Sequence, residues 1–415
     1  MNGQMGGGAR YMAVGTSPSP LRKFNPSRFR HYEYFFYLAL FYSIVNATWG
    51  INIPYLASSV IMTIALLCLL ARRTGLFGLL KKIGLPLLCI VSYVFIQRIF
   101  HGENGTSFIP YFMWGAYLVI VQSLLSRPNF FFRMSFALFA TGMAMIPYLR
   151  LSGGEDRGGL GTASAISNPN DLAAWFGFCV IVFTIRALQT TRILDRFGSG
   201  LIAFVSLMIV GATVSRGALS ALTLAAVVGF RRQLKRGFVP IFILVLMAVT
   251  GLAFGVFDNA ISHYSQRGIE ETGRMTVFKP AFQRFIDSPL VGVGLSSAGT
   301  LTPEGEVRLP HDSLLYLALV SGLFPLLFFL AYMLVAYNRA LHASLNHPYL
   351  NYLMPLIAYC SFILIVADNV FIAPWFILTF AACLYETRRV AQAGAQWRNN
   401  PGSPWVQASS FPRMR

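Results

Sequence analysis

The sequence contains FVPIFILVLMAVTGLAFGVF at residues 238–257 and SLLYLALVSGLFPLLFFLAYMLVAY at residues 313–337, two stretches without a charged residue. A helix needs about 20 mainly apolar residues to cross the hydrocarbon core of a bilayer. Each stretch reaches that length. The sequence therefore predicts an integral membrane protein.

The composition of the whole chain supports the same class. Of its 415 residues, 55% are hydrophobic and 12% are charged, whereas soluble proteins carry about 25% charged residues. A soluble domain is excluded. We expect an all-α integral membrane protein with about twelve transmembrane helices, at residues 33–48, 51–71, 83–100, 108–125, 132–149, 171–188, 199–214, 217–230, 238–257, 313–336, 352–367 and 370–386. The five cysteines lie in these apolar runs and are expected to be core side chains.

The distribution of Lys and Arg predicts the orientation. Most of the 33 basic residues fall on one side when the spans alternate, and that side is cytoplasmic by the positive-inside rule. The chain then divides into a disordered cytoplasmic tail at residues 1–32, a membrane domain at 33–386 and a cytoplasmic tail at 387–415. The net charge of +18 is accounted for mainly by topology, so we expect membrane lipids, and no nucleic acid, as partners.

Two longer loops are expected on the outer face, at residues 150–170 and 258–312. The second contains residues 275–285, in which Val277, Phe278, Ala281, Phe282 and Phe285 recur at helical spacing. This pattern predicts an amphipathic helix that lies on the membrane surface or over a cavity.

Basic residues on this outer face require an explanation, and Arg216 is the most informative. It lies between two apolar runs in Thr213-Val-Ser-Arg-Gly-Ala-Leu, at or within the membrane boundary. It is either an interfacial Arg whose charge reaches water or an anion-binding group facing a cavity, and intramembrane charges favour the second. Further outer cations are Arg150, Arg157, Arg274, Lys279 and Arg284. Salt bridges are the simpler explanation for Arg157 and Arg274, and capping of a helix end is the simpler one for Arg150.

His311 precedes Asp312 and a long apolar span. Asp312 or Ser313 is expected to cap that helix, and a neutral imidazole could accept a proton from a sugar hydroxyl. From the residues alone, a structural role is favoured for His311 and Arg274. Nucleotide-binding, zinc-protease and Cys/His motifs are absent from the sequence, so no cofactor and no metal are expected.

Three motifs in this order resemble the O-antigen ligase and O-antigen polymerase family of bacterial membrane proteins. They are Ser215-Arg216-Gly217; Arg274 followed by Asp287-Ser-Pro-Leu-Val-Gly-Val-Gly; and His311-Asp-Ser-Leu-Leu-Tyr followed by Ser321-Gly-Leu. Arg157 with Asn168-Pro-Asn-Asp-Leu-Ala resembles the start of the family domain. The resemblance covers about residues 150–330, and it departs from the family at Asp312, where many relatives have Asn or Ser.

The resemblance implies an enzyme of the bacterial inner membrane with a periplasmic active site. A glycan would pass from undecaprenyl pyrophosphate to a hydroxyl of lipid A-core, without metal or ATP and with inversion. It implies catalytic roles for His311, Arg216 and Arg274. Arg157, Arg150, Lys279, Arg284 and Asp312 are candidate contacts to the pyrophosphate or glycan.

Other functions remain open. A polymerase of the same family would transfer the glycan to another lipid-linked repeat. A protein O-glycosyltransferase is less favoured, because such relatives often carry a large extra periplasmic domain. A transporter or flippase of a lipid-linked anion would place Arg216 on a translocation path, but paired broken helices or inverted repeats are typical of that class and none is visible in the sequence.

Overall fold

The structure is a computed structural model of the 415-residue chain, and it describes residues 33–41, 63–64, 67–68, 92–102, 109–125, 127, 129–146, 149–151, 158–160, 169–213, 215–230, 274–301, 307–310, 312–346, 350–367, 370 and 373–399. The predicted span 238–257 and most of the span 51–71 lie outside these residues.

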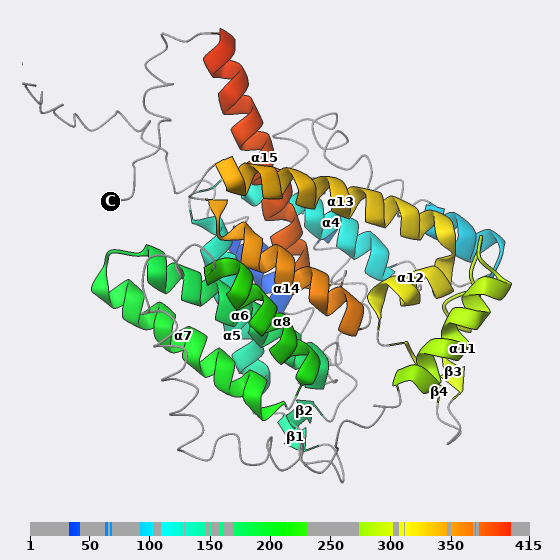
Figure 1. Cartoon of the computed structure of the whole chain (residues 1–415). Helices are drawn as coiled ribbons and strands as arrows, with labels where there is room; N and C mark the ends of the chain where they lie inside the picture. The colour runs from blue at the N-terminus through cyan, green and yellow to red at the C-terminus, as the bar shows by residue number, and fades with distance from the viewer. Residues whose placement is uncertain are drawn as a thin grey trace, which may run out of the picture.

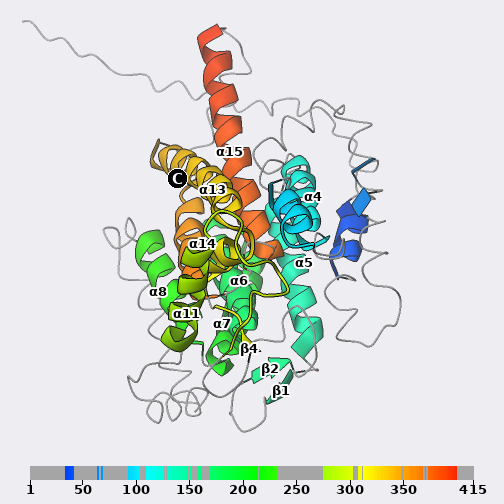
Figure 2. The same ribbon diagram turned by 90° about the vertical axis from the view of Figure 1, so that its right-hand side faces the viewer.

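The described residues form a bundle of helices (Figure 1). Residues 33–41 and 92–99 are helical, and the helices that follow are α4 (Ile109–Leu124), α5 (Phe130–Met145), α6 (Pro169–Gln189), α7 (Ile193–Ala212), α8 (Arg216–Phe230), α11 (Arg274–Asp287), α12 (Ser313–Ser321), α13 (Leu323–Asn346), α14 (Leu353–Val366) and α15 (Pro374–Asn399). The last turns of α15 project beyond the other helices (Figures 1 and 2).

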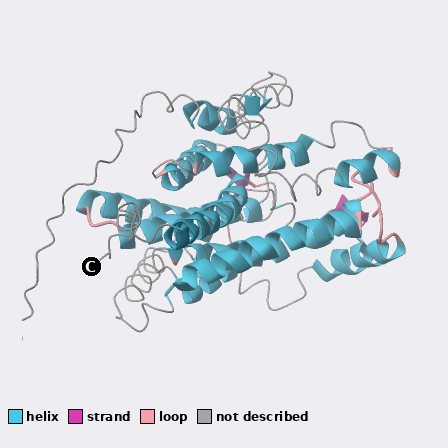
Figure 3. Cartoon of the chain, turned by 90° about the horizontal axis from the view of Figure 1, so that it is seen from above, coloured by secondary structure: helices cyan, strands magenta, loops and turns pink. Residues whose placement is uncertain are grey.

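Strands are confined to two small antiparallel sheets in the described part of the chain (Figure 3). β1 (Leu149–Leu151) pairs with β2 (Gly158–Leu160), and β3 (Thr300–Leu301) pairs with β4 (Val307–Arg308). Both sheets belong to the segments that the sequence predicts as outer loops.

Within the described part of the chain, three helices are long and apolar enough to cross a membrane, over Asn170–Gln189, Ile193–Ala212 and Leu323–Leu345. Shorter apolar helices accompany them, over Trp114–Leu124, Phe130–Met145, Arg216–Gly229 and Leu353–Val366. The chain is therefore a helical protein with membrane character, while the number of twelve spans stays a prediction.

The predicted span 313–336 is wrong as a single helix. It is divided at Gly322, whose backbone has φ 77° and ψ −168°, into α12 and α13. Hydropathy is insensitive to this break because the residues on both sides are apolar. Only glycine adopts such a conformation at little cost.

Helix α6 lies at the centre of the bundle and is mostly buried, whereas only 22% of the α7 span is buried. The indole of Trp175 donates to the carbonyl of Leu138 on α5 at 3.0 Å, and the hydroxyl of Tyr359 on α14 donates to the carbonyl of Ala174 at 2.8 Å. These bonds satisfy polar groups in an interior without water. Cys179, Cys360 and Cys383 are buried as expected, whereas Cys68 is exposed, so the prediction of a core position is wrong for Cys68.

Helices α8 and α14 pack antiparallel through two glycines. A Cβ on Gly217 would lie 3.0 Å from Val366 Cγ2, and one on Gly229 would lie 3.2 Å from Pro355 Cβ. The two backbones approach closely along the whole contact because small residues occupy it. The start of α8 therefore lies beside the end of α14.

Basic side chains gather at one end of the bundle. Glu33 accepts hydrogen bonds from Arg127 at 3.0 Å and from Arg133 at 2.6 Å, and the Tyr37 hydroxyl donates to the same carboxylate at 2.6 Å. This buried cluster joins the helix at residues 33–41 to the corner between α4 and α5.

Two further arginines from predicted cytoplasmic segments are at the same end. Arg186, near the end of α6, lies over the ring of Phe132 at 5.0 Å. Arg388 on α15 donates to Gln122 near the end of α4 at 3.2 Å. Segments that the positive-inside rule assigns to one side thus converge in space.

Candidate functional site

The opposite end of the bundle contains the start of α8, where Arg216 lies. Ser215 precedes it as the helix N-cap: its hydroxyl accepts from the Ala218 amide at 3.4 Å and donates to Asn170 Oδ1 at 2.9 Å. Ser is a preferred capping residue because its oxygen accepts a bond from a backbone amide with no helical partner. The bond to Asn170 joins the start of α8 to the start of α6.

Arg216 is the first residue of α8 and is partly exposed. Helix α7 ends at Ala212, so the turn before it is as short as the sequence predicts. This position satisfies both interpretations of the residue, because an Arg at a helix start can reach the interface or a bound anion.

The end of α14 connects this region to the start of α12. The hydroxyl of Ser313 donates to the carbonyl of Ala367 at 2.6 Å and accepts from the amide of Val370 at 3.0 Å. Since Val366 lies against Gly217, the starts of α6, α8 and α12 meet around the end of α14. In Figure 1 this end of the bundle is at the lower right.

Asp312 has a defined structural task at this end. Its Oδ1 accepts from the amides of Leu314 and Leu315 at 2.9 and 2.8 Å, which confirms the predicted N-cap. Burial raises the pKa of the Asp312 carboxyl above its ordinary value, and the two backbone hydrogen bonds oppose that rise. A contact between Asp312 and substrate stays a prediction.

The electrostatics of this end favour an anion. Each helix start carries a partial positive charge of roughly half a unit, while Ser215 and Asp312 pair backbone amides at the starts of α8 and α12. Three such starts and the guanidinium of Arg216 lie there together. Asp171 in the first turn of α6 and Asp312 offset part of this charge.

Helix α11 carries three of the other predicted cations. Arg274 is its first residue, and Lys279 is exposed on it. Arg284 donates from Nη1 to the carbonyl of Gly299 at 2.7 Å and from Nη2 to the carbonyl of Ser297. This guanidinium fixes α11 to the segment before β3, which is a structural function that its place in the sequence does not reveal.

The loop after α11, residues 289–294, is here named the glycine loop. It runs along the junction of α12 and α13: the amide of Val293 donates to Leu319 O at 2.8 Å, that of Gly294 to Val320 O at 3.2 Å, and that of Leu323 to Pro289 O at 2.8 Å. Gly292 and Gly294 have φ of 68° and 84°. Its glycines are therefore required for close backbone packing.

Two polar residues of the helix at 92–99 and the turn after it hold the glycine loop from the other side. Gln97 donates to Val320 O at 2.7 Å and accepts from the Leu295 amide at 3.2 Å. The ring Nε2 of His101 lies 2.8 Å from Val291 O. Sequence reasoning missed both residues, although a glutamine inside the apolar run 83–100 was an available signal.

Several predicted site residues cannot be placed at this end. His311 and Arg157 lie outside the described residues, and the side chains of Arg274 and Arg150 do too. The backbone of Arg150 pairs with Gly159 in the small sheet of β1 and β2. The structure therefore brings Arg216 and Asp312 to one end of the bundle, and the convergence of His311 and Arg274 with them stays a prediction.

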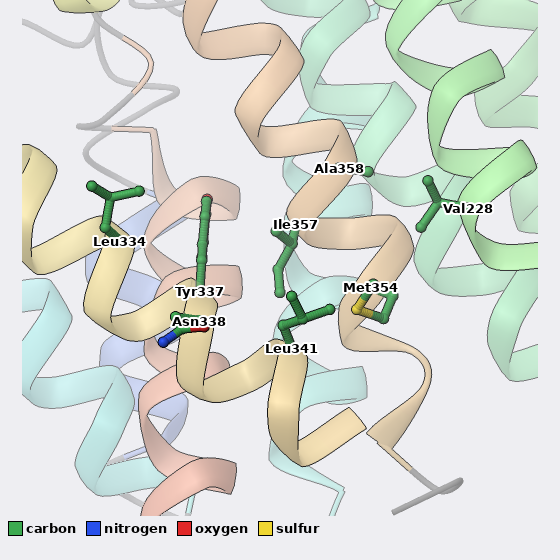
Figure 4. A pocket seen from close by; sticks show the side chains of 8 residues that line it. All are labelled: Val228, Leu334, Tyr337, Asn338, Leu341, Met354, Ile357 and Ala358. Atoms are coloured by element: carbon green, nitrogen blue, oxygen red, sulfur yellow. The ribbon is translucent and has the colours of Figure 1, made fainter. Parts of the chain in front are cut away.

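A cavity of about 400 Å³ lies elsewhere, between α8, α13 and α14 (Figure 4). It is lined by Val228, Leu334, Tyr337, Asn338, Leu341, Met354, Ile357 and Ala358. Val228 follows Arg216 by twelve residues, about 18 Å along α8 at 1.5 Å per residue. The cavity has no charged lining residue, so it does not suit a pyrophosphate.

Among the described residues, no group of three or more His, Cys, Asp and Glu side chains is arranged to hold a metal ion. Comparison with protein-family models and with curated proteins finds no match to this chain.

Proposed function

We propose that the chain is an O-antigen ligase, a glycosyltransferase that moves a polysaccharide from undecaprenyl pyrophosphate to lipid A-core on the periplasmic face of the inner membrane. The proposal rests on the motif resemblance and on one structural observation. The starts of α6, α8 and α12 meet around the end of α14, with Arg216 at the start of α8.

This observation fits the demands of the reaction. The leaving group is a pyrophosphate, so negative charge develops at the membrane boundary as the glycosidic bond breaks. A guanidinium pairs bidentately with phosphate oxygens. The helix starts add a partial positive charge that is preorganised and needs no rearrangement during the reaction.

The proposed step is a single displacement. The acceptor hydroxyl oxygen attacks the anomeric carbon, and the bond from that carbon to the phosphate oxygen breaks. His311 takes the hydroxyl proton as general base, and Arg216 and Arg274 stabilise the departing pyrophosphate. The carbon inverts because no carboxylate nucleophile takes part.

The proposed orientation has twelve spans, a large periplasmic loop over residues 258–312 and both termini in the cytoplasm. The ion-pair cluster of Glu33, Arg127 and Arg133 and the positions of Arg186 and Arg388 support it, because these basic side chains lie away from the Arg216 end.

The test is transfer by the purified protein in detergent, with a lipid-pyrophosphate-linked glycan, lipid A-core, EDTA and no nucleotide. The expected product is a ladder of glycan-extended lipopolysaccharide on a gel. Arg216→Ala is expected to lower the rate by about 100-fold or more, the effect of removing one oxyanion-stabilising donor, and His311→Ala is expected to abolish the ladder.

Two matched controls lie on the described surface. Arg196→Ala removes an exposed Arg that bonds the carbonyl of Thr190, and His342→Ala removes an exposed His on α13. Both are expected to keep normal transfer. Elongation of the lipid-linked glycan itself, without transfer to lipid A-core, would identify a polymerase, and transfer to neither acceptor would favour the transporter.

A further inference from the structure

Helix α11 has an apolar face that the rest of the protein covers only in part. At about 100° per residue, Val277, Ala281 and Phe285 form one stripe and Phe278, Phe282 and Ile286 form the next. The sequence places both stripes on a single apolar face. The structure treats them differently.

The first stripe packs inward. Val277 and Ala281 are buried, and Phe285 packs against the hydrophobic core. The second stripe faces outward: Phe278, Phe282 and Ile286 are 38%, 46% and 49% exposed, and the rings of Phe278 and Phe282 stack at 6.2 Å. Leu290, in the glycine loop three residues after the end of α11, is also exposed.

The remaining arc of α11 is polar. Lys279, Gln283 and Asp287 are exposed on it, and Gln283 donates to Asp287 at 3.0 Å. The bonds from Arg284 to Gly299 and Ser297 attach α11 to the segment before β3. The helix therefore has a buried apolar stripe, an exposed apolar stripe and an exposed polar arc.

The segments beside the exposed stripe indicate what it contacts. The glycine loop is hydrogen-bonded through Pro289 to Leu323, the first residue of α13. Helix α13 is long and apolar enough to span a membrane, and its first turns expose Phe324 and Leu327. Leu290 therefore lies at the level where the lipid-facing surface of α13 begins.

The end of the helix at residues 92–99 lies beside the glycine loop as well and also exposes apolar side chains. His101 bonds Val291 O, and the helix at residues 92–99 and the turn after it expose Phe95, Ile99 and Phe100. In Figure 1, α11 lies next to the start of α13 and is steeply inclined to it. Such an inclination to a helix that can span the membrane is what an amphipathic helix lying in the interface would have.

We propose that α11 is an interfacial helix whose stripe Phe278, Phe282, Ile286 and Leu290 inserts into the bilayer leaflet next to the start of α13. The inference is independent of glycosyl transfer and requires only that the bundle lies in a membrane. It commits to lipid as the occupant, because the stripe continues two lipid-facing surfaces.

The test is photocrosslinking of the full chain in lipid nanodiscs. Benzoylphenylalanine is placed at position 282, where it replaces an exposed Phe, or at position 283 on the polar arc as the matched control. A third site, position 334 on the exposed side of α13, is the positive control for lipid contact. Irradiated samples are analysed by mass spectrometry for lipid adducts.

The expected result is lipid adducts at 282 and 334 and several-fold fewer at 283. Equal adducts at 282 and 283 would overturn the proposal, because the helix would then have no fixed lipid-facing side. A crosslinked dimer at 282 would assign the stripe to a second copy instead. Adducts at 334 without adducts at 282 would place α11 away from the bilayer.

Discussion

Replacement of Gly322 by Ala is expected to be one of the most damaging single changes at the Arg216 end of the bundle. At φ 77° and ψ −168°, a residue with a Cβ is strained by about 1–3 kcal/mol. The new Cβ would also collide with the carbonyl oxygen of Leu290 and lie 2.7 Å from the amide nitrogen of Val291. The glycine loop must then move away.

That movement removes the loop's three hydrogen bonds to the α12–α13 junction, made by Val293, Gly294 and Leu323. At about 1 kcal/mol each, and with the backbone strain added, the loss is about 4–6 kcal/mol. For a chain of 415 residues, with an unfolding entropy of about 2 cal/mol/K per residue, this corresponds to a fall in Tm of about 5–7 °C.

The assay is thermal unfolding in detergent, followed by size-exclusion chromatography of the heated samples. Gly198→Ala is the matched control, because Gly198 lies inside α7 and an added Cβ would meet no atom within 4 Å. This change is expected to be neutral or to stabilise by about 0.5–1 kcal/mol. Equal midpoints for Gly322→Ala and Gly198→Ala would refute the structural role of Gly322.

Three further outcomes are expected. Glu33→Ala leaves the buried Arg127 without its carboxylate and is expected to destabilise the protein by about 3 kcal/mol. The control in the same thermal assay is Arg389→Ala, which breaks the more exposed pair with Glu386 at 3.6 Å. Equal effects of the two changes would argue against a buried cluster. Ser215→Ala removes the cap of α8 and the bond to Asn170 and is expected to lower stability by about 1 kcal/mol. Ser123→Ala, which loses a bond to the carbonyl of Val119 in its own helix, is expected to change the midpoint less. Asp312 has a pKa raised above 3.8 in the folded state, so folding favours its protonated form, and the native protein loses stability as the pH rises from 3.8 through the folded pKa. Asp312→Asn keeps a capping oxygen and is expected to remove this dependence of the unfolding midpoint on pH. An unchanged slope of midpoint against pH in the variant would contradict this account.

Much of the helical architecture could be predicted from hydropathy. The expected span 171–188 corresponds to α6 at Pro169–Gln189, and the span 217–230 to α8 at Arg216–Phe230. Long uninterrupted apolar runs specify such helices because every backbone group must be paired within lipid. The N-cap at Asp312 and the short turn before Arg216 were also predictable, since they follow from local chemistry.

Features that depend on distant contacts were not predictable. The break at Gly322 requires the glycine loop, which comes from another part of the chain. The split of the apolar face of α11 depends on which residues α12 covers. Arg284 was predicted as a pyrophosphate ligand from charge alone, and its bonds to Gly299 and Ser297 could not be anticipated without the fold of the following segment.

The bond between Gln97 and Val320 has a consequence for biogenesis. The two residues are 223 positions apart, and a ribosome adds roughly 5–20 residues per second. Val320 is therefore synthesised roughly 10–50 s after Gln97. During that interval a polar side chain in an early apolar segment needs a temporary partner, such as the insertion machinery or headgroup water. The order of synthesis thus makes the early helices dependent on assistance until α12 arrives.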